Sequence, residues 1–219
     1  MIGFQTEEDA QNFLHGCSQF IDQATVDVSS GTVDWKGHCT KVRTYPTSID
    51  IDEVRKIASS PRVAEYEQAL APMCDKHTIV RVDRAEPSKN VVRGFRSYQI
   101  FLERYPEFRE QVNFLAFLVP ARTHIKQYER YREEIDNLVK NINATYATST
   151  WTPIQIFYEN NYAQALAGMR LYDTLLVNSV ADGMNLVAKE GPVVNSRNGV
   201  LILSEGTGAY SQLRDGALV

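Results

Sequence analysis

The sequence predicts an α/β protein in which a parallel β-sheet is covered by helices on both faces. Two observations lead to this fold class. From residue 77 onward, short and almost wholly apolar segments alternate with longer segments whose apolar residues recur at helical spacing. Strands that are apolar on both faces are typical of parallel sheets, because helices bury each side. The 219 residues, of which 43% are apolar, can bury the core of one large domain or of one and a half ordinary domains.

The first elements of the chain are expected to be a helix and a hairpin. Thr6 is followed by acidic residues, and this combination favours a helix start because hydroxyl and carboxylate groups stabilise the free amides there. The helix is expected to end near Ile21. β-forming residues at 32–35 and 39–44 flank a turn-like Lys-Gly-His segment, which predicts a β-hairpin.

The elements that follow produce the alternation of strands and helices. Residues 51–70 have apolar side chains at helical spacing, and a Ser-Ser-Pro segment interrupts them, so Pro61 is expected to begin a second helix. The remaining segments are predicted in this order: a strand over 78–82, a helix over 91–105, a strand over 112–119, a helix over 124–142, a strand over 153–158, a helix over 162–171, a strand over 174–177, a helix from about 185 and a strand over 200–203.

Composition excludes several classes of function. The net charge is −4, so the chain lacks the basic surface of a nucleic-acid-binding protein. No apolar run reaches the roughly 18 residues that a membrane span needs. Cys17, Cys39 and Cys74 are odd in number and form no CxxC pair, which favours a reducing, cytoplasmic compartment. The four histidines are dispersed without ligand spacing, so we expect no metal and no cofactor.

Charged residues follow the first predicted strand of the parallel sheet. In such sheets, ligands bind beyond the carboxyl ends of the strands, where loops meet the N-termini of helices. Arg84 and Lys89 lie five residues apart in the loop after residue 82, just ahead of a helix. Two cations at this edge can neutralise a diphosphate. A solvated, charged loop is the alternative interpretation, and spacing alone favours it.

A second candidate site follows the strand over 174–177. Gly183 precedes a short helix, where a glycine lets a ligand approach the backbone and the first amides are free donors. Asp182 can accept hydrogen bonds from sugar hydroxyls, and Glu190 can accept them from a ribose. Asp182 can equally be only a helix cap, and the apolar residues of this segment are more often core than ligand contacts.

Two further features lie on the same predicted edge. Arg122 follows the strand over 112–119, and arginine suits bidentate phosphate binding, although a solvated surface arginine is the simpler interpretation. Residues 204–209 are rich in glycine but match no GxGxxG or P-loop pattern. We interpret them as a close-packed turn near the site.

The segment after residue 177 contains a nine-residue run, Asp182-Gly183-Met184-Asn185-Leu186-Val187-Ala188-Lys189-Glu190. This run resembles the signature of retaining glycosyltransferases of the trehalose-6-phosphate synthase family, also known as glycosyltransferase family 20. The resemblance covers essentially the whole chain, because further similar segments occur in the family's order: Ile2 to Thr6, Tyr45-Pro46 before Ile49-Asp50, Arg84 with Lys89, Arg122, Trp151 to Pro153, and Val200 to Ser204.

The resemblance implies a fold and an activity. Residues 46–219 correspond to the Rossmann-like, nucleotide-sugar-binding C-terminal domain of a two-domain GT-B enzyme, truncated at its C-terminus. Residues 1–45 correspond to the end of the N-terminal, acceptor-side domain. The implied reaction moves glucose, with retention, from a nucleotide-glucose to glucose 6-phosphate and gives trehalose 6-phosphate without a metal. We expect the chain alone to be inactive, and homo-oligomerisation stays open.

The resemblance also assigns roles to individual residues. Arg84 and Lys89 would bind the donor diphosphate and Glu190 the ribose, and Arg122 would reach the phosphate of the acceptor. Asp182 would hold the transferred glucose and is counted, with Arg84 and Lys89, among the catalytic residues. The other donor-binding residues are Tyr162, which takes the place of a family aromatic, and Gly183, Met184, Asn185, Leu186 and Val187.

Two departures from the family pattern leave alternatives. The phosphate loop of better-known members reads Arg-Leu-Asp-Tyr-Thr-Lys-Gly, whereas residues 84–90 read Arg-Ala-Glu-Pro-Ser-Lys-Asn, and Ala181 replaces a frequent arginine. The donor base, UDP, GDP or ADP, therefore stays open. A glucosylglycerol-phosphate synthase and a pseudo-glycosyltransferase with a cyclitol donor are alternative activities. A non-catalytic nucleotide-sugar-binding module is a rival of a different class.

Overall fold

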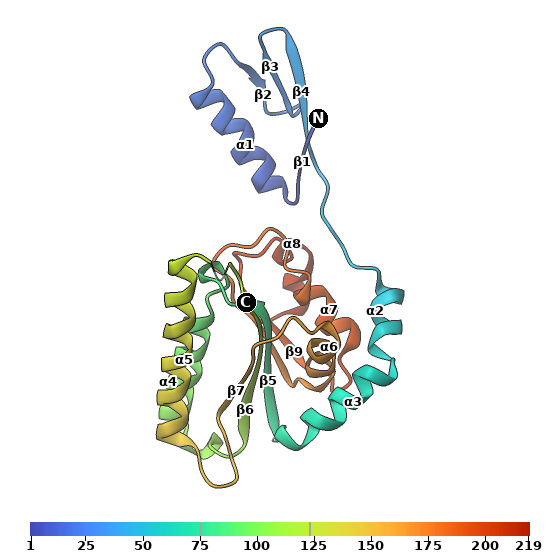
Figure 1. Ribbon diagram of the computed structural model, residues 1–219. Coiled ribbons are helices and arrows are strands. Elements are labelled where there is room, and N and C mark those ends of the chain that lie inside the picture. The colour runs from blue at the N-terminus through green and yellow to red at the C-terminus, as the bar shows by residue number, and fades with distance from the viewer. Residues whose placement is uncertain (75, 123) are drawn as a thin grey trace. The chain divides into compact units, whose positions relative to one another are not determined.

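The computed structural model describes residues 1–74, 76–122 and 124–219, and the chain forms two compact units (Figure 1). The first unit is Met1–Ser48 and the second is Ile49–Val219. The sequence predicts a boundary between residues 45 and 46, slightly before the boundary in the structure. The assignment of the first unit to an acceptor-side domain stays a prediction.

The first unit is one helix packed against a four-stranded sheet. The side chain of Thr6 accepts a hydrogen bond from the Asp9 amide and caps α1 (Glu7–Phe20), as predicted. The predicted hairpin is also present, and its two central residues, Lys36 and Gly37, have the positive φ angles of a two-residue turn. The sheet has the order β1-β4-β3-β2, with strands Ile2–Phe4 (β1), Thr25–Asp27 (β2), Thr32–Trp35 (β3) and His38–Thr44 (β4).

The second unit contains the predicted parallel sheet. Its five strands lie in the order β7-β6-β5-β8-β9, and every pair of neighbours is parallel. The fold class predicted from the sequence is therefore confirmed. The strands are His77–Arg84 (β5), Val112–Val119 (β6), Ile154–Phe157 (β7), Thr174–Val177 (β8) and Val200–Leu203 (β9).

Helices cover both faces of this sheet. Figure 1 shows α4 and α5 on one face and α2, α3, α6 and α7 on the other, and each group packs with the strands in its own apolar cluster. The α-helices are Ile51–Ala58 (α2), Pro61–Leu70 (α3), Val91–Arg104 (α4), Lys126–Tyr146 (α5), Tyr162–Leu171 (α6), Val187–Val194 (α7) and Tyr210–Leu213 (α8). Short 3₁₀ turns are Ala71–Met73 (η1), Pro87–Lys89 (η2), Pro106–Phe108 (η3) and Arg214–Gly216 (η4).

Two boundaries differ from the prediction in ways that affect the site. β5 does not end at Val82, because its pairing with β6 continues until Arg84 lies opposite Val119. Arg84 is therefore a strand residue and not a loop residue. α7 begins at Val187 and not at Asn185, because Asn185 has a left-handed backbone with φ of 65°.

The strand order defines where a ligand is expected. β5 lies between β6 and β8, and the chain leaves β5 through α4 toward β6 but leaves β8 through α7 toward β9. The two connections diverge, so the carboxyl ends of β5 and β8 flank a topological switch point, which is the usual ligand site of open α/β sheets. The loops that contain Lys89 and Asp182 meet there.

Candidate functional site

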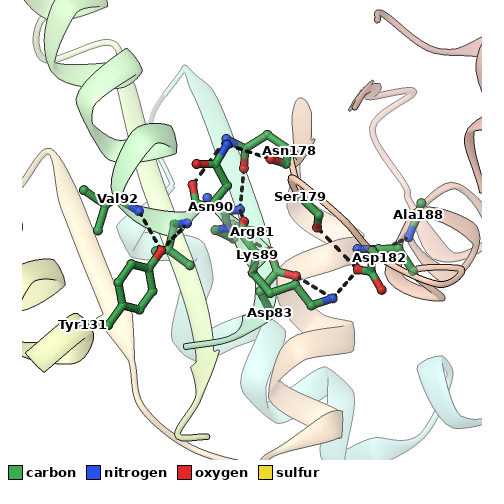
Figure 2. A network of polar contacts seen from close by, with 12 residues as sticks. Arg81, Asp83, Lys89, Asn90, Val92, Tyr131, Asn178, Ser179, Asp182 and Ala188 are labelled. Atoms are coloured by element: carbon green, nitrogen blue, oxygen red, sulfur yellow. Dashed lines mark hydrogen bonds and ion pairs between the residues drawn. The ribbon is translucent and has the colours of Figure 1, made fainter. Parts of the chain in front are cut away.

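Lys89 lies at the switch point between β5 and β8. It ends the 3₁₀ turn η2, and Asn90, with a left-handed φ of 59°, then directs the chain into α4. The Lys89 side chain is only 11% exposed. Its Nζ forms an ion pair with Oδ1 of Asp83 at 3.4 Å and a short contact with the carboxylate of Asp182 (Figure 2). The structure therefore brings Lys89 and Asp182, two predicted site residues, into direct contact.

Side chains of its own loop also orient the Asp182 carboxylate. Oδ2 accepts hydrogen bonds from Nδ2 of Asn185 at 2.9 Å and from Oγ of Ser179 at 3.4 Å. Oδ1 of Asn185 accepts from the amide of Ala188 at 3.1 Å, in the first turn of α7. Asn185 therefore links the start of this helix to Asp182 and fixes the direction of the carboxylate.

The glycine-rich turn after β9 supports the Asp182 backbone. The amide of Asp182 donates to the carbonyl of Gly206 at 2.9 Å, and its carbonyl accepts from the amide of Gly208 at 3.0 Å. A Cβ added at Gly206 would lie 2.2 Å from the carbonyl oxygen of Val180, so only glycine fits. The prediction of a close-packed turn is confirmed.

A fully buried arginine lies beneath the site, and sequence reasoning missed it. Arg81 donates from Nε to Oδ2 of Asp83 at 2.9 Å and from Nη2 to the carbonyl of Lys89 and to Oδ1 of Asn178, each at 2.5 Å (Figure 2). Burial raises the pKa of the Asp83 carboxyl, and the two neighbouring cations oppose that shift. The signal was present in the sequence, because an arginine inside the apolar run 78–82 requires a buried partner.

Arg84 has a different environment from Lys89. Its side chain is 56% exposed, and Nη2 forms an ion pair with Oε1 of Glu86 at 2.9 Å. Within the described part of the chain, no hydrogen bond or ion pair joins Arg84 to Lys89 or Asp182. Both cations lie at the carboxyl end of β5, and their joint binding of a diphosphate stays a prediction.

The backbone before α7 provides free donors. Among the residues that the structure describes, the amides of 183–187 donate to no protein acceptor. Leu186 and Gly183 are exposed, whereas the Met184 side chain is buried in the core beneath. Any contact of Met184 with a ligand would therefore come from its backbone.

Glu190 and Tyr162 face each other from α7 and α6. The Tyr162 hydroxyl donates to Oε1 of Glu190 at 2.9 Å. Burial raises the pKa of the Glu190 carboxyl, and the hydrogen bond from Tyr162 opposes the shift. Burial and the Glu190 charge both raise the pKa of Tyr162. The pair presents one carboxylate acceptor that a tyrosine holds in place.

Arg122 lies apart from the Lys89 and Asp182 contacts. It is exposed in the loop after β6, has a left-handed φ of 44°, and places its guanidinium 5.4 Å from the ring centre of Tyr128. No ion pair to Arg122 is found across 1–74, 76–122 and 124–219. Its role toward an acceptor phosphate stays a prediction.

In the described residues, no group of three or more His, Cys, Asp or Glu side chains is placed to hold a metal ion. The predicted metal independence is a separate matter and stays a prediction. No helix in the same part of the chain combines the length and apolarity that crossing a membrane requires.

Comparisons with known proteins identify the family of the chain. A sequence model of glycosyltransferase family 20 matches residues 1–219. The UDP-forming α,α-trehalose-phosphate synthase of Schizosaccharomyces pombe is 32% identical over 225 residues, which cover 100% of this chain and 42% of the relative.

Two solved structures are similar over almost the whole chain. One is an α,α-trehalose-phosphate synthase (UDP-forming) from Burkholderia xenovorans in complex with glucose 6-phosphate, with a TM-score of 0.88 and 30% identity over 99% of this chain and 49% of that one. The other, described as trehalose-6-phosphate from Escherichia coli bound with UDP-2-fluoro glucose, has a TM-score of 0.86 and 29% identity over 99% and 48%. The chain thus spans less than half the length of these relatives.

Proposed function

Because the chain belongs to glycosyltransferase family 20, we propose that it supplies the nucleotide-sugar site of a retaining glycosyltransferase. The enzyme moves glucose from a nucleotide-glucose to glucose 6-phosphate and gives trehalose 6-phosphate. Three relatives support this choice of substrates: one is UDP-forming, one is bound to a UDP-glucose analogue and one to glucose 6-phosphate. UDP is accordingly the proposed nucleotide of the donor.

The observation that carries the proposal is the meeting of Lys89 and Asp182 at the switch point. A primary ammonium group and a carboxylate with fixed orientation lie in contact there, one after β5 and one after β8. Lys89 neutralises the donor diphosphate, with Arg84 beside it, and Asp182 accepts hydrogen bonds from the hydroxyls of the glucose. The free amides of 183–187 add donors for phosphate or sugar oxygens.

The chemistry follows from where charge develops. The bond between C1 of glucose and the phosphate oxygen breaks, and negative charge grows on the departing nucleoside diphosphate. Lys89 and Arg84 stabilise that charge, which lowers the barrier electrostatically. The acceptor hydroxyl attacks C1 from the face that the diphosphate leaves, and its proton passes to the departing phosphate. The configuration at C1 is therefore retained.

The remaining site residues complete the proposal. Glu190, held by Tyr162, accepts from the ribose hydroxyls, and Arg122 binds the phosphate of glucose 6-phosphate. Leu186 and Val187 line the nucleotide pocket. The reaction needs no metal and takes place in the cytoplasm, where the thiols stay reduced.

Binding to the 219-residue chain is the first test. Calorimetry with UDP, GDP, ADP and UDP-glucose should show that UDP and UDP-glucose bind and that Lys89→Met removes most of the affinity. Lys140→Met is the matched control, because Lys140 is an exposed lysine on α5. Equal losses in both variants, or no binding of any nucleotide to the wild-type chain, would contradict the proposed site.

Transfer is tested in the protein as it is encoded, with any flanking sequence included. UDP-glucose, GDP-glucose and a nucleotide-linked cyclitol are each offered with glucose 6-phosphate and glycerol 3-phosphate, and products are identified by mass. Trehalose 6-phosphate is expected, and replacing Arg84 and Lys89 with Ala should abolish turnover. Unchanged turnover would remove both residues from the mechanism.

The product distinguishes the alternatives. Transfer to glycerol 3-phosphate alone would identify a glucosylglycerol-phosphate synthase. Turnover only with a nucleotide-linked cyclitol would identify a pseudo-glycosyltransferase. Tight nucleotide-sugar binding without transfer to any acceptor would identify a binding module.

A further inference from the structure

The central strand of the large sheet contains a buried ionic chain below the candidate site. Arg81 is 0% exposed, Asp83 is buried beside it, and the Lys89 ammonium lies on the other side of the same carboxyl group (Figure 2). Arg81 holds Oδ2 of Asp83 at 2.9 Å, while Oδ1 faces Lys89 at 3.4 Å. The order of charges from the core outward is therefore Arg81, Asp83, Lys89 and Asp182.

We propose that Arg81 is a positioning residue that keeps Lys89 available for the diphosphate of the nucleotide-sugar. This inference rests on the function proposed above and concerns how the Lys89 ammonium group is held in position. Arg81 does not touch the substrate and acts through Asp83 and through the backbone of Lys89.

The charge of Arg81 balances the charges around Lys89. Lys89 has two carboxylate neighbours, so alone it cannot neutralise both and also attract an anion. Arg81 supplies the second positive charge, and the four groups then sum to zero. Without Arg81 the cluster has one excess negative charge, in a buried place where water screens it poorly. That charge repels the diphosphate and draws the Lys89 ammonium toward Asp83.

The Arg81 guanidinium also holds two loops of the site together. Nη2 of Arg81 binds both the carbonyl of Lys89 and Oδ1 of Asn178, so one guanidinium joins the loop after β5 to the loop after β8. Nδ2 of Asn90 donates to the carbonyl of Asn178 at 3.0 Å and reinforces the same junction. A lysine has no planar fork with which to reproduce these contacts together with the Asp83 bond.

The helix above Arg81 is shaped to admit it. Gly94 of α4 lies against the guanidinium, and a Cβ added there would come within 2.5 Å of Nη1. Any residue other than glycine would therefore displace the arginine. The pairing of a large buried cation with a glycine at this point is consistent with a specific requirement for Arg81.

The test compares UDP binding and unfolding in five variants of the full chain. Arg81→Met should weaken UDP binding by about tenfold or more, and Arg81→Lys should recover only part of the loss. Arg81→Met with Asp83→Asn should bind more tightly than Arg81→Met, because the uncompensated carboxylate is gone. Leu102→Ala is the control for lost stability, since Leu102 is buried roughly 16 Å along α4 from Val91.

A merely structural role would give a different pattern. Arg81→Met would then lower the unfolding midpoint, as Leu102→Ala does, and leave the dissociation constant of the folded molecules unchanged. Equal UDP affinity of the single and double variants would likewise overturn the proposal. Gly94→Ala crowds Arg81 without changing any charge, so it should weaken UDP binding even where Arg81→Met fails to fold. A wild-type chain that binds no UDP would instead refute the proposed function itself.

Discussion

Replacing Lys89 with methionine removes the ammonium group that lies between two carboxylates, Asp83 and Asp182. Methionine keeps an unbranched apolar side chain, so the change mainly deletes a charge and its hydrogen bonds. The variant should lose stability as well as nucleotide affinity, because the side chain is only 11% exposed. We expect the loss of stability to depend on pH.

The size of the stability loss depends on the partners that Asp83 and Asp182 keep in the Lys89→Met variant. Removing one member of a buried ion pair costs about 3 to 5 kcal/mol, because the other charge is left uncompensated. Asp83 keeps Arg81, and Asp182 keeps the donors of Asn185 and Ser179, so the lower value of about 3 kcal/mol applies near neutral pH. With an m-value of about 2 kcal/mol/M, the urea midpoint should fall by roughly 1.5 M.

The stability loss caused by Lys89→Met should become smaller as the pH falls. Burial already raises the pKa of Asp83, and losing Lys89 removes a cation that opposes this shift. A carboxyl group whose pKa is higher in the folded state than in the unfolded state lowers stability at high pH. That cost disappears as the pH falls through the folded-state pKa. The difference in the free energy of unfolding between Lys89→Met and wild type should therefore narrow as the pH falls from neutrality into the acid range.

Urea unfolding, monitored by tryptophan fluorescence, measures the loss of stability. Trp151 is buried in the second unit and Trp35 lies in the first, so a Trp35→Phe background restricts the signal to the unit that contains Lys89. Lys140→Met in the same background is the control and should leave the midpoint unchanged. A Lys89→Met midpoint equal to that of wild type at neutral pH, or a gap that stays constant on acidification, would refute the reasoning.

Three further perturbations test other parts of the site. UDP affinity should fall on acidification earlier than an ordinary glutamate allows, because burial raises the pKa of Glu190 and protonation removes a ribose acceptor. Calorimetry across the pH range should show that the UDP affinity of Glu190→Gln depends less on pH than that of wild type. An equally steep pH dependence in both would exclude Glu190 as the titrating group. Gly206→Ala should lower the thermal midpoint by several degrees in calorimetry, because its Cβ would collide with the Val180 carbonyl, whereas Gly216→Ala, with no neighbour within 4 Å, should not. Tyr131→Phe should cost about 1 kcal/mol and speed hydrogen exchange at the start of α4, since the tyrosine hydroxyl accepts from the first two amides of that helix.

Local patterns were sufficient to predict most elements of the second unit. β6, α6 and β8 have the predicted bounds, because the ends of an apolar strand and the start of a capped helix are marked by neighbouring residues in the sequence. Asn161, for example, caps α6 by accepting a hydrogen bond from the amide of Gln164. The strand β1 was not predicted, because its three residues show no alternation and its partner, β4, lies about forty residues further along the chain.

Long-range contacts explain what the sequence could not predict at the site. The resemblance to the family predicted Asp182 and Lys89 as site residues, but only the fold places them in contact across 93 residues of sequence. Arg81 and Asn178 are 97 residues apart, and neither belongs to a recognisable motif. A buried arginine signals that a partner exists without saying which residue it is.

The two predicted cations, although only five residues apart, cannot contribute equally. Arg84 is largely exposed, and water and salt screen a charge in that position over roughly 8 Å at physiological ionic strength. Lys89 is nearly buried, so its field acts through a medium of lower dielectric and reaches a neighbouring phosphate with less loss. The same burial makes Lys89 costly unless carboxylates accompany it, and Asp83 and Asp182 meet that need. Lys89 and its two carboxylates therefore depend on one another electrostatically, whereas the contribution proposed for Arg84 to phosphate binding should be weaker and more sensitive to salt.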